Sequence, residues 1–209
     1  MTILLVAVVV LPLYYRFQES WPPTIEFDGV TWTQVLDWDF EDGFFPGGWG
    51  WGNYSIVDGK LEIEDLTGDE SVYILPVRHG GDFLLEAKVK IVRGFHLCYV
   101  AAQLITRDSE QVNYESGLAI LPGMNQAIVR HMANGIDYVY TAFPINMTID
   151  YDKWYVMRLM VHNGVVKAFL NGTQIYVSNS AFPAGEYREP HLAVRYGVAQ
   201  FEHLKILLR

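Results

Sequence analysis

The sequence is poor in cysteine and in basic residues. Among its 209 residues there is one cysteine, Cys98, which excludes an internal disulfide framework and a cysteine-based zinc site. Lysine and arginine together number 15 against 24 aspartates and glutamates, which gives a formal charge of -9. No block of basic residues is present that could neutralise a phosphate backbone. We therefore expect no nucleic-acid partner.

Recognised catalytic and cofactor motifs are also missing. The sequence has no Gly-x-Ser-x-Gly elbow and no glycine-rich loop that ends in Gly-Lys-Ser/Thr. Its six histidines, at positions 79, 96, 131, 162, 191 and 203, do not have the short spacings of metal-binding motifs. We expect these histidines to lie on the surface or to be satisfied on the face of a sheet. The sequence thus predicts no catalytic residue, no enzyme and no cofactor, apart from the calcium considered below.

Charged side chains are absent from residues 1–15. The aliphatic run within this segment must be buried against a membrane or another protein surface, because no soluble surface would leave it exposed. As a helix this segment would rise about 22 Å, short of the roughly 30 Å hydrocarbon core, so aromatic residues at the interface would have to help it span. We predict that residues 1–17 anchor the chain in a membrane, with the rest on the extracytoplasmic side, periplasmic or at the cell surface. The membrane-contacting or docking residues are Ile3, Leu4, Leu5, Val6, Val8, Val9, Val10, Leu11, Tyr14 and Tyr15.

Two alternatives to a membrane anchor stay open for this segment. The β-branched run from Val8 to Val10 suits a strand donated to a neighbouring subunit, as in a donor-strand filament. An atypical signal sequence is the second, although no basic residue precedes the run. Residues 18–36 are broken by prolines and lack a sustained period, which is typical of a linker or arm.

Residues 37–209 contain the pattern of an all-β domain. Turn signals recur about every ten residues, and helical spacing of apolar residues is almost absent. Asn163-Gly164 and Asn171-Gly172 separate three β-rich runs and predict a meander, while Asp58-Gly59 predicts a hairpin. Residues 83–91 alternate between apolar and mainly charged side chains, as a half-buried antiparallel strand does. About a dozen such strands predict a two-sheet antiparallel sandwich, because one open sheet would leave an apolar face uncovered.

Several short motifs carry a family resemblance over roughly residues 37–208. They are Asp39-Phe40-Glu41-Asp42, Trp49 with its glycine-rich approach, Val57-Asp58-Gly59-Lys60-Leu61, residues 83–89, Trp154-Tyr155, residues 168–172 and residues 201–206. In these motifs the chain resembles the concanavalin A-like lectin/glucanase superfamily, in its laminin-G-like and keto-glycoside-hydrolase-like branches. The resemblance implies a jelly-roll sandwich of two curved sheets, with the concave sheet as the usual ligand face.

Acidic residues offer two candidate sites. The Glu-x-Asp-x-x-Glu string that glucanases of this superfamily carry is absent, and the cluster of Glu62, Glu64, Asp65, Asp69 and Glu70 is expected to be a solvated strand edge and loop. A second group crowds a strand-to-loop junction, where hard oxygen ligands could hold a structural Ca²⁺, the alternative being a surface acidic patch. Its residues are Asp37, Asp39, Glu41 and Asp42.

Large aromatic rings separated by glycines form the most unusual stretch, residues 44–54. Uncovered ring faces can stack on sugars, contact a protein or a membrane, or plug one end of the sandwich. The candidate contact residues are Phe44, Phe45, Trp49, Trp51 and Tyr54.

These features give a leading functional hypothesis and three alternatives. The leading one is a non-catalytic, membrane-anchored accessory subunit that packs on protein subunits of a larger assembly, such as a respiratory or photosynthetic complex. The alternatives are an extracytoplasmic carbohydrate-binding module that takes a glycan partner, a donor-strand filament subunit, and a hydrolase that acts on glycosides, the last by fold analogy alone.

Overall fold

The structure is a computed structural model that describes residues 22–41, 43, 47–107, 113–122, 126–133, 136–178 and 187–209. These residues form strands and no helix. The strands are β1 (Thr24–Phe27), β2 (Val30–Trp38), β3 (Trp49–Trp51), β4 (Asn53–Val57), β5 (Lys60–Asp65), β6 (Ser71–Ile74), β7 (Phe83–Arg107), β8 (Asn113–Ile120), β9 (Gln126–Ala133), β10 (Ile136–Pro144), β11 (Trp154–His162), β12 (Val165–Leu170), β13 (Thr173–Val177) and β14 (Tyr187–Leu208).

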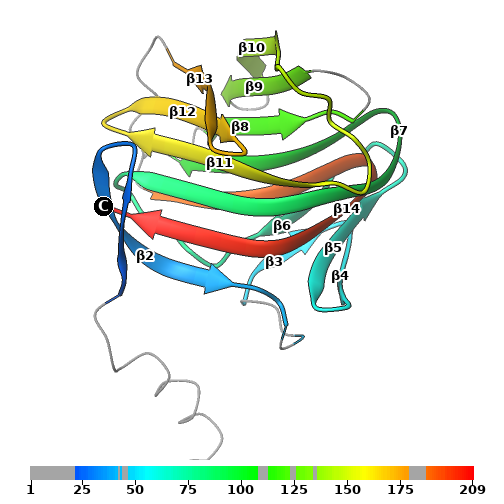
Figure 1. Cartoon of the computed structure of the whole chain (residues 1–209), viewed down its shortest axis with the longest axis horizontal. Helices are drawn as coiled ribbons and strands as arrows, with labels where there is room; N and C mark the ends of the chain where they lie inside the picture. The colour runs from blue at the N-terminus through cyan, green and yellow to red at the C-terminus, as the bar shows by residue number, and fades with distance from the viewer. Residues whose placement is uncertain are drawn as a thin grey trace, which may run out of the picture.

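Two long strands organise the sandwich. β7 has 25 residues and β14 has 22, and they pair with each other along almost their whole length (Figure 1). Their ladder has three register shifts, between Arg195 and His203. Bulges of this kind bend a strand, so β7 and β14 run through both layers of the fold.

The ends of β7 and β14 belong to different sheets. Sheet A contains β3, β6, the first half of β14, the second half of β7, and then β8, β9 and β10. Sheet B contains β1, β2, the second half of β14, the first half of β7, and then β11, β12 and β13. The hairpin of β4 and β5 joins the middle of β14. All these pairings are antiparallel, which confirms the predicted antiparallel jelly-roll sandwich.

Alternation along the strands sets the core between the two sheets. The apolar positions of residues 83–91, from Phe83 to Ile91, are fully buried in the main core cluster. The intervening charged residues form ion pairs on the outer face of sheet B, for example Glu86 with Arg158 and Lys88 with Glu202. The half-buried strand predicted here is confirmed.

The turn dipeptides act as the sequence predicts. Asp58, Asn163 and Asn171 all have φ near +50°, and the glycine that follows each also has a positive φ. Positive φ at both central residues is the type I′ geometry that joins adjacent antiparallel strands. The β4–β5 hairpin and the β11–β12–β13 meander are therefore confirmed.

The segment expected to be a linker or arm, residues 18–36, differs from the prediction. From Thr24 onward it forms the hairpin of β1 and β2, with a turn at Asp28-Gly29 where both φ angles are positive. Trp32, fully buried on the outer face of sheet B, holds β2 in place, and its Nε1 donates to Phe27 O at 3.2 Å. The prolines precede the hairpin and so do not interrupt it.

The predicted anchor, residues 1–17, lies outside the described residues. The described residues include no helix that could span a membrane. The anchor and its donor-strand alternative stay predictions.

Candidate functional site

Two tryptophans stand side by side on the outer face of sheet A. β3 pairs with β6 so that Trp49 lies opposite Ile74 and Trp51 opposite Val72. Their ring centroids are 6.4 Å apart with a tilt of 52°, and the side chains are 53% and 46% exposed. Trp49 and Trp51 thus form an exposed aromatic platform.

A glycine between the two rings allows β3 to lie close to β6. A Cβ atom on Gly50 would lie 2.0 Å from the carbonyl oxygen of Val72, far inside van der Waals contact. Any larger residue at this position would push β3 away from sheet A. The Trp-Gly-Trp pattern therefore serves both the exposure of the rings and the packing of the strand that carries them.

Small apolar side chains line the outer face of sheet A beside the platform. Val72, Ile74, Ala101 and Ala193 form a buried cluster that is separate from the main core. Ala101 pairs with Ala193 across the β7–β14 ladder. Because these side chains are short, longer polar residues on the neighbouring rows can reach over them.

Glu70, just before β6, is one of those longer residues. Its Oε1 accepts a hydrogen bond from Tyr99 Oη at 2.7 Å and another from Gln103 Nε2 at 3.3 Å. Its φ of +66° is rare for a residue with a side chain. Such strain is found where the surroundings hold a residue in place, frequently at functional sites.

The loop that carries Glu70 is fixed by Asp65. This side chain is 4% exposed and accepts hydrogen bonds from the backbone N–H groups of Thr67, Gly68 and Tyr196. Burial alone would raise the pKa of Asp65, but these hydrogen bonds outweigh it and lower the pKa below its ordinary value. Arg195 Nε adds a 2.8 Å bond to Gly68 O.

A hollow of about 420 Å³ opens between Trp51 and this loop. Its walls carry one indole ring, one amide, two hydroxyls and four carboxylates. They comprise Trp51, Gly52, Asn53, Glu64, Asp65, Leu66, Thr67, Asp69, Glu70 and Ser71. An apolar ring with a few convergent polar groups is the usual make-up of a small-molecule site.

Glu189 and His191 lie behind the platform on the same face of β14. Both are buried, and the ring of Trp51 meets that of His191 edge to face at 6.4 Å. Arg78 donates to Glu189 Oε1. The neighbouring His191 ring, and then Arg78, hold the pKa of Glu189 below its ordinary value, although burial opposes them.

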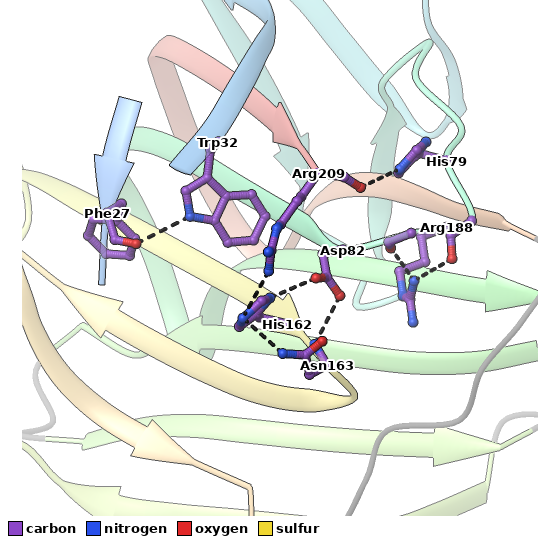
Figure 2. Close-up of polar contacts among 10 residues, drawn as sticks. Phe27, Trp32, His79, Asp82, His162, Asn163, Arg188 and Arg209 are labelled. Carbon is purple, nitrogen blue, oxygen red and sulfur yellow. Dashed lines mark hydrogen bonds and ion pairs between the residues drawn. The ribbon is translucent and has the colours of Figure 1, made fainter. Parts of the chain in front are cut away.

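The outer face of sheet B carries a different polar cluster, shown in Figure 2. Asp82 and His162 contact each other there, with Oδ2 and Nδ1 2.7 Å apart. Asn163 N donates to Asp82 Oδ1 at 2.9 Å, and His79 Nε2 lies 3.1 Å from Arg209 O. These contacts tie the end of β14 to the start of β7 and to the β11–β12 turn.

Comparison with known proteins finds the same fold in solved structures. No protein-family model matches the chain, and no curated protein matches it. The endo-β-1,3-glucanase of Pyrococcus furiosus superposes with a TM-score of 0.72 at 13% identity, over 90% of this chain and 98% of that one. The chain has the concanavalin A-like jelly-roll fold.

Other structures with the concanavalin A-like fold match as well. The carbohydrate-binding module CBM66 of Bacillus subtilis gives a TM-score of 0.59 at 16% identity, over 76% of this chain and 93% of that one. An endo-β-galactosidase of Clostridium perfringens gives a TM-score of 0.67 at 8% identity, over 90% of this chain and 65% of that one. At these identities the likeness establishes the fold alone.

These comparisons correct two expectations. The leading hypothesis of a non-catalytic accessory subunit is contradicted, because the structures that share the fold are mostly laminarinases, glucanases and carbohydrate-binding modules. The expectation that the chain is not an enzyme is contradicted by the same neighbours. It rested on a missing linear motif, and such an absence does not exclude carboxylates at another spacing, as with Glu64 and Glu70, which both line the hollow.

The structure separates the predicted aromatic contact residues. Trp49 and Trp51 lie together on the surface, whereas Tyr54 is half-buried against the core with its ring 5.2 Å from that of Tyr73. Phe44 and Phe45 lie outside the described residues.

The predicted calcium ligands make other contacts. Asp37 pairs with His203 and lies 3.9 Å from Lys205, and Asp39 Oδ1 accepts a hydrogen bond from the backbone N of Glu41 at 3.2 Å. Among the described residues no group of three histidine, cysteine or acidic side chains is placed to hold a metal ion. Asp42 lies outside them, so the calcium site stays a prediction.

Sequence reasoning missed several residues of this face. Asp65 and Glu70 were expected in a solvated loop, yet Asp65 is buried and Glu70 reaches over sheet A to Tyr99. Glu189 and His191 drew no functional assignment. Their two-residue spacing in a β-rich run was the available signal, because alternation puts such residues on one face.

Proposed function

We propose that the chain binds a glycan on the outer face of sheet A, with Trp49 and Trp51 stacked against sugar rings. The exposed tryptophan pair carries this proposal. Flat indole faces cover the apolar faces of sugar rings, and they are costly to leave in water without a partner. The hollow beside Trp51 supplies groups that can bond sugar hydroxyls, among them Asn53, Thr67 and Glu70.

The charges around the hollow favour a neutral glycan. Glu64, Asp69 and Glu70 all line it, and the whole chain has a formal charge of -9. Carboxylates and sulfates on a sugar would be repelled at such close range, where salt screens poorly. An extracytoplasmic location, predicted from the apolar N-terminal segment, is consistent with a polysaccharide partner and is part of the proposal.

The test is a binding assay against β-1,3-glucan, mixed-linkage β-glucan and β-galactan by affinity electrophoresis, followed by calorimetry with the hexasaccharide of the polymer that binds. We expect Trp49→Ala and Trp51→Ala each to weaken binding at least tenfold. Trp154→Ala is the matched control, because this partly exposed tryptophan lies on β11 in sheet B with Lys88 and Lys90 over its ring. If the wild type binds none of the three polymers, the proposal is contradicted.

Hydrolysis of the bound glycan is a second candidate, favoured by the two carboxylates of Glu64 and Glu70 in one hollow. In such a reaction one carboxylic acid protonates the glycosidic oxygen as its bond to the anomeric carbon breaks. The other carboxylate attacks that carbon, or takes a proton from the water that does so. New reducing ends released from the bound polymer, and lost in Glu70→Gln, would support catalysis. Binding with no release of reducing ends would support glycan binding and contradict hydrolysis.

A further inference from the structure

Glu189 and His191 are neighbouring buried residues, and each has a side-chain polar atom without a hydrogen-bond partner among the residues described. Their side chains are 2% and 8% exposed. Among the residues described, neither Glu189 Oε2 nor His191 Nε2 has a hydrogen-bond partner. A buried polar group left unpaired is costly, so a pair of them side by side points to a ligand group that would satisfy both.

The geometry of the two orphaned atoms suits one small ligand group. They lie 4.0 Å apart, which is too long for a hydrogen bond between them. One oxygen atom can nevertheless lie within normal hydrogen-bond distance, about 2.8 Å, of both. A hydroxyl would donate its proton to Glu189 Oε2 and accept one from His191 when the imidazole carries its proton on Nε2.

Two neighbours control this pair. Arg78 holds the other carboxylate oxygen of Glu189, which fixes the direction of Oε2. Trp51 packs its ring against His191 but is itself nearly half exposed. Exposed side chains change rotamer within nanoseconds, so this ring can turn outward fast enough to admit a ligand.

We propose that Glu189 and His191 form a subsite for one hydroxyl group of a neutral sugar, which becomes accessible when Trp51 turns to stack on that sugar. The inference rests on the proposed glycan-binding function and adds a specificity element to it. Trp51 supplies stacking, which every sugar ring can satisfy, whereas the pair beneath it recognises a hydroxyl at one position. A sugar without that hydroxyl leaves both buried atoms unpaired and binds more weakly. A carboxylate at that position would be repelled by Glu189.

The test uses the full chain, the hexasaccharide of the β-glucan or β-galactan that binds, and monodeoxy versions of it. We expect Glu189→Gln and His191→Leu each to lower affinity about tenfold or more. One deoxy position should cost the wild type a similar factor and cost His191→Leu clearly less, because that variant keeps only Glu189 to bond the hydroxyl. Glu86→Gln is the matched control, since it removes a carboxylate from an ion pair with Arg158 on sheet B.

The outcomes separate the two proposals. If the wild type binds, Trp49→Ala weakens binding and both pair variants bind like the wild type, the subsite is overturned and glycan binding stands. If the wild type binds none of the three polymers, both proposals fall. If Glu189→Gln fails to fold, the affinities of His191→Leu and of the deoxy sugars decide the test. His191→Leu is suitable because it leaves the Arg78–Glu189 contact in place.

Discussion

Two of the acid–histidine pairs among the described residues, one on the outer face of each sheet, differ in how their atoms are used. On sheet B, Asp82 and His162 contact each other at 2.7 Å, and Asn163 bonds both side chains (Figure 2). On sheet A, Glu189 and His191 stay 4.0 Å apart. The sheet B pair is also more exposed, at 21% and 19% for the two side chains.

This difference separates a structural contact from a candidate binding contact. Polar groups that hydrogen-bond to each other stabilise the fold, whereas buried polar groups without a hydrogen-bond partner destabilise it until a ligand binds them. The sheet B cluster lies where the chain end meets β7, and the sheet A pair lies under an exposed tryptophan. Mutations in the two pairs should therefore affect different properties.

The largest expected effect on stability is that of His162→Leu. Leucine has a similar size but cannot bond Asp82, so a partly buried carboxylate loses its charge-assisted partner. We expect a loss of about 2 kcal/mol in the free energy of unfolding, measured by urea denaturation at pH 7. His203→Leu is the control, because its pair with Asp37 is about 40% exposed and should contribute about 0.5 kcal/mol or less. Equal losses in both variants would refute a structural role for the Asp82–His162 pair.

A smaller effect is expected for Asp65→Asn, in the loop beside the sheet A pair. Loss of the charged acceptor should cost about 1 to 2 kcal/mol at pH 7. The pKa of Asp65 is lowered from its ordinary value of 3.8, so the unfolded chain takes up the proton first as pH falls. Its stabilising contribution is thus complete above about pH 5 and is lost as pH falls through the lowered pKa. Urea denaturation from pH 7 to pH 2 should show a steeper loss in the wild type than in Asp65→Asn, and parallel curves would contradict the assignment.

Much of the fold could be predicted because it depends on local patterns. Asn163-Gly164 and Asn171-Gly172 fix turns through backbone conformation, and the alternation from Phe83 to Ile91 fixes which face is buried. Both signals act over a few residues. The same reasoning failed for β1 and β2, where prolines before Thr24 concealed the hairpin turn at Asp28-Gly29.

The candidate site was only half predictable, for a physical reason. Trp49 and Trp51 were visible because they lie two positions apart in the sequence and are flanked by glycines. The contact of Glu70 with Tyr99 joins residues 29 positions apart, and it depends on the pairing of β6 and β7 with β14. Nothing local in the sequence encodes such a contact. The absence of a glucanase string was therefore weak evidence against catalysis.

The smallest expected effect on stability is that of His191→Leu, which is the sharpest contrast with His162→Leu. His191 Nε2 has no hydrogen-bond partner within the described part of the chain, so leucine removes an unpaired polar atom and keeps most of the buried volume. Leucine also removes the ring that helps to keep Glu189 ionised, so we expect the two effects nearly to cancel and the free energy of unfolding to stay within about 0.5 kcal/mol of the wild type. A loss near that of His162→Leu in urea denaturation would mean that His191 has a stabilising partner after all. If His191→Leu retains its stability while its glycan affinity falls, the unpaired Nε2 atom serves binding and lowers the stability of the unliganded protein.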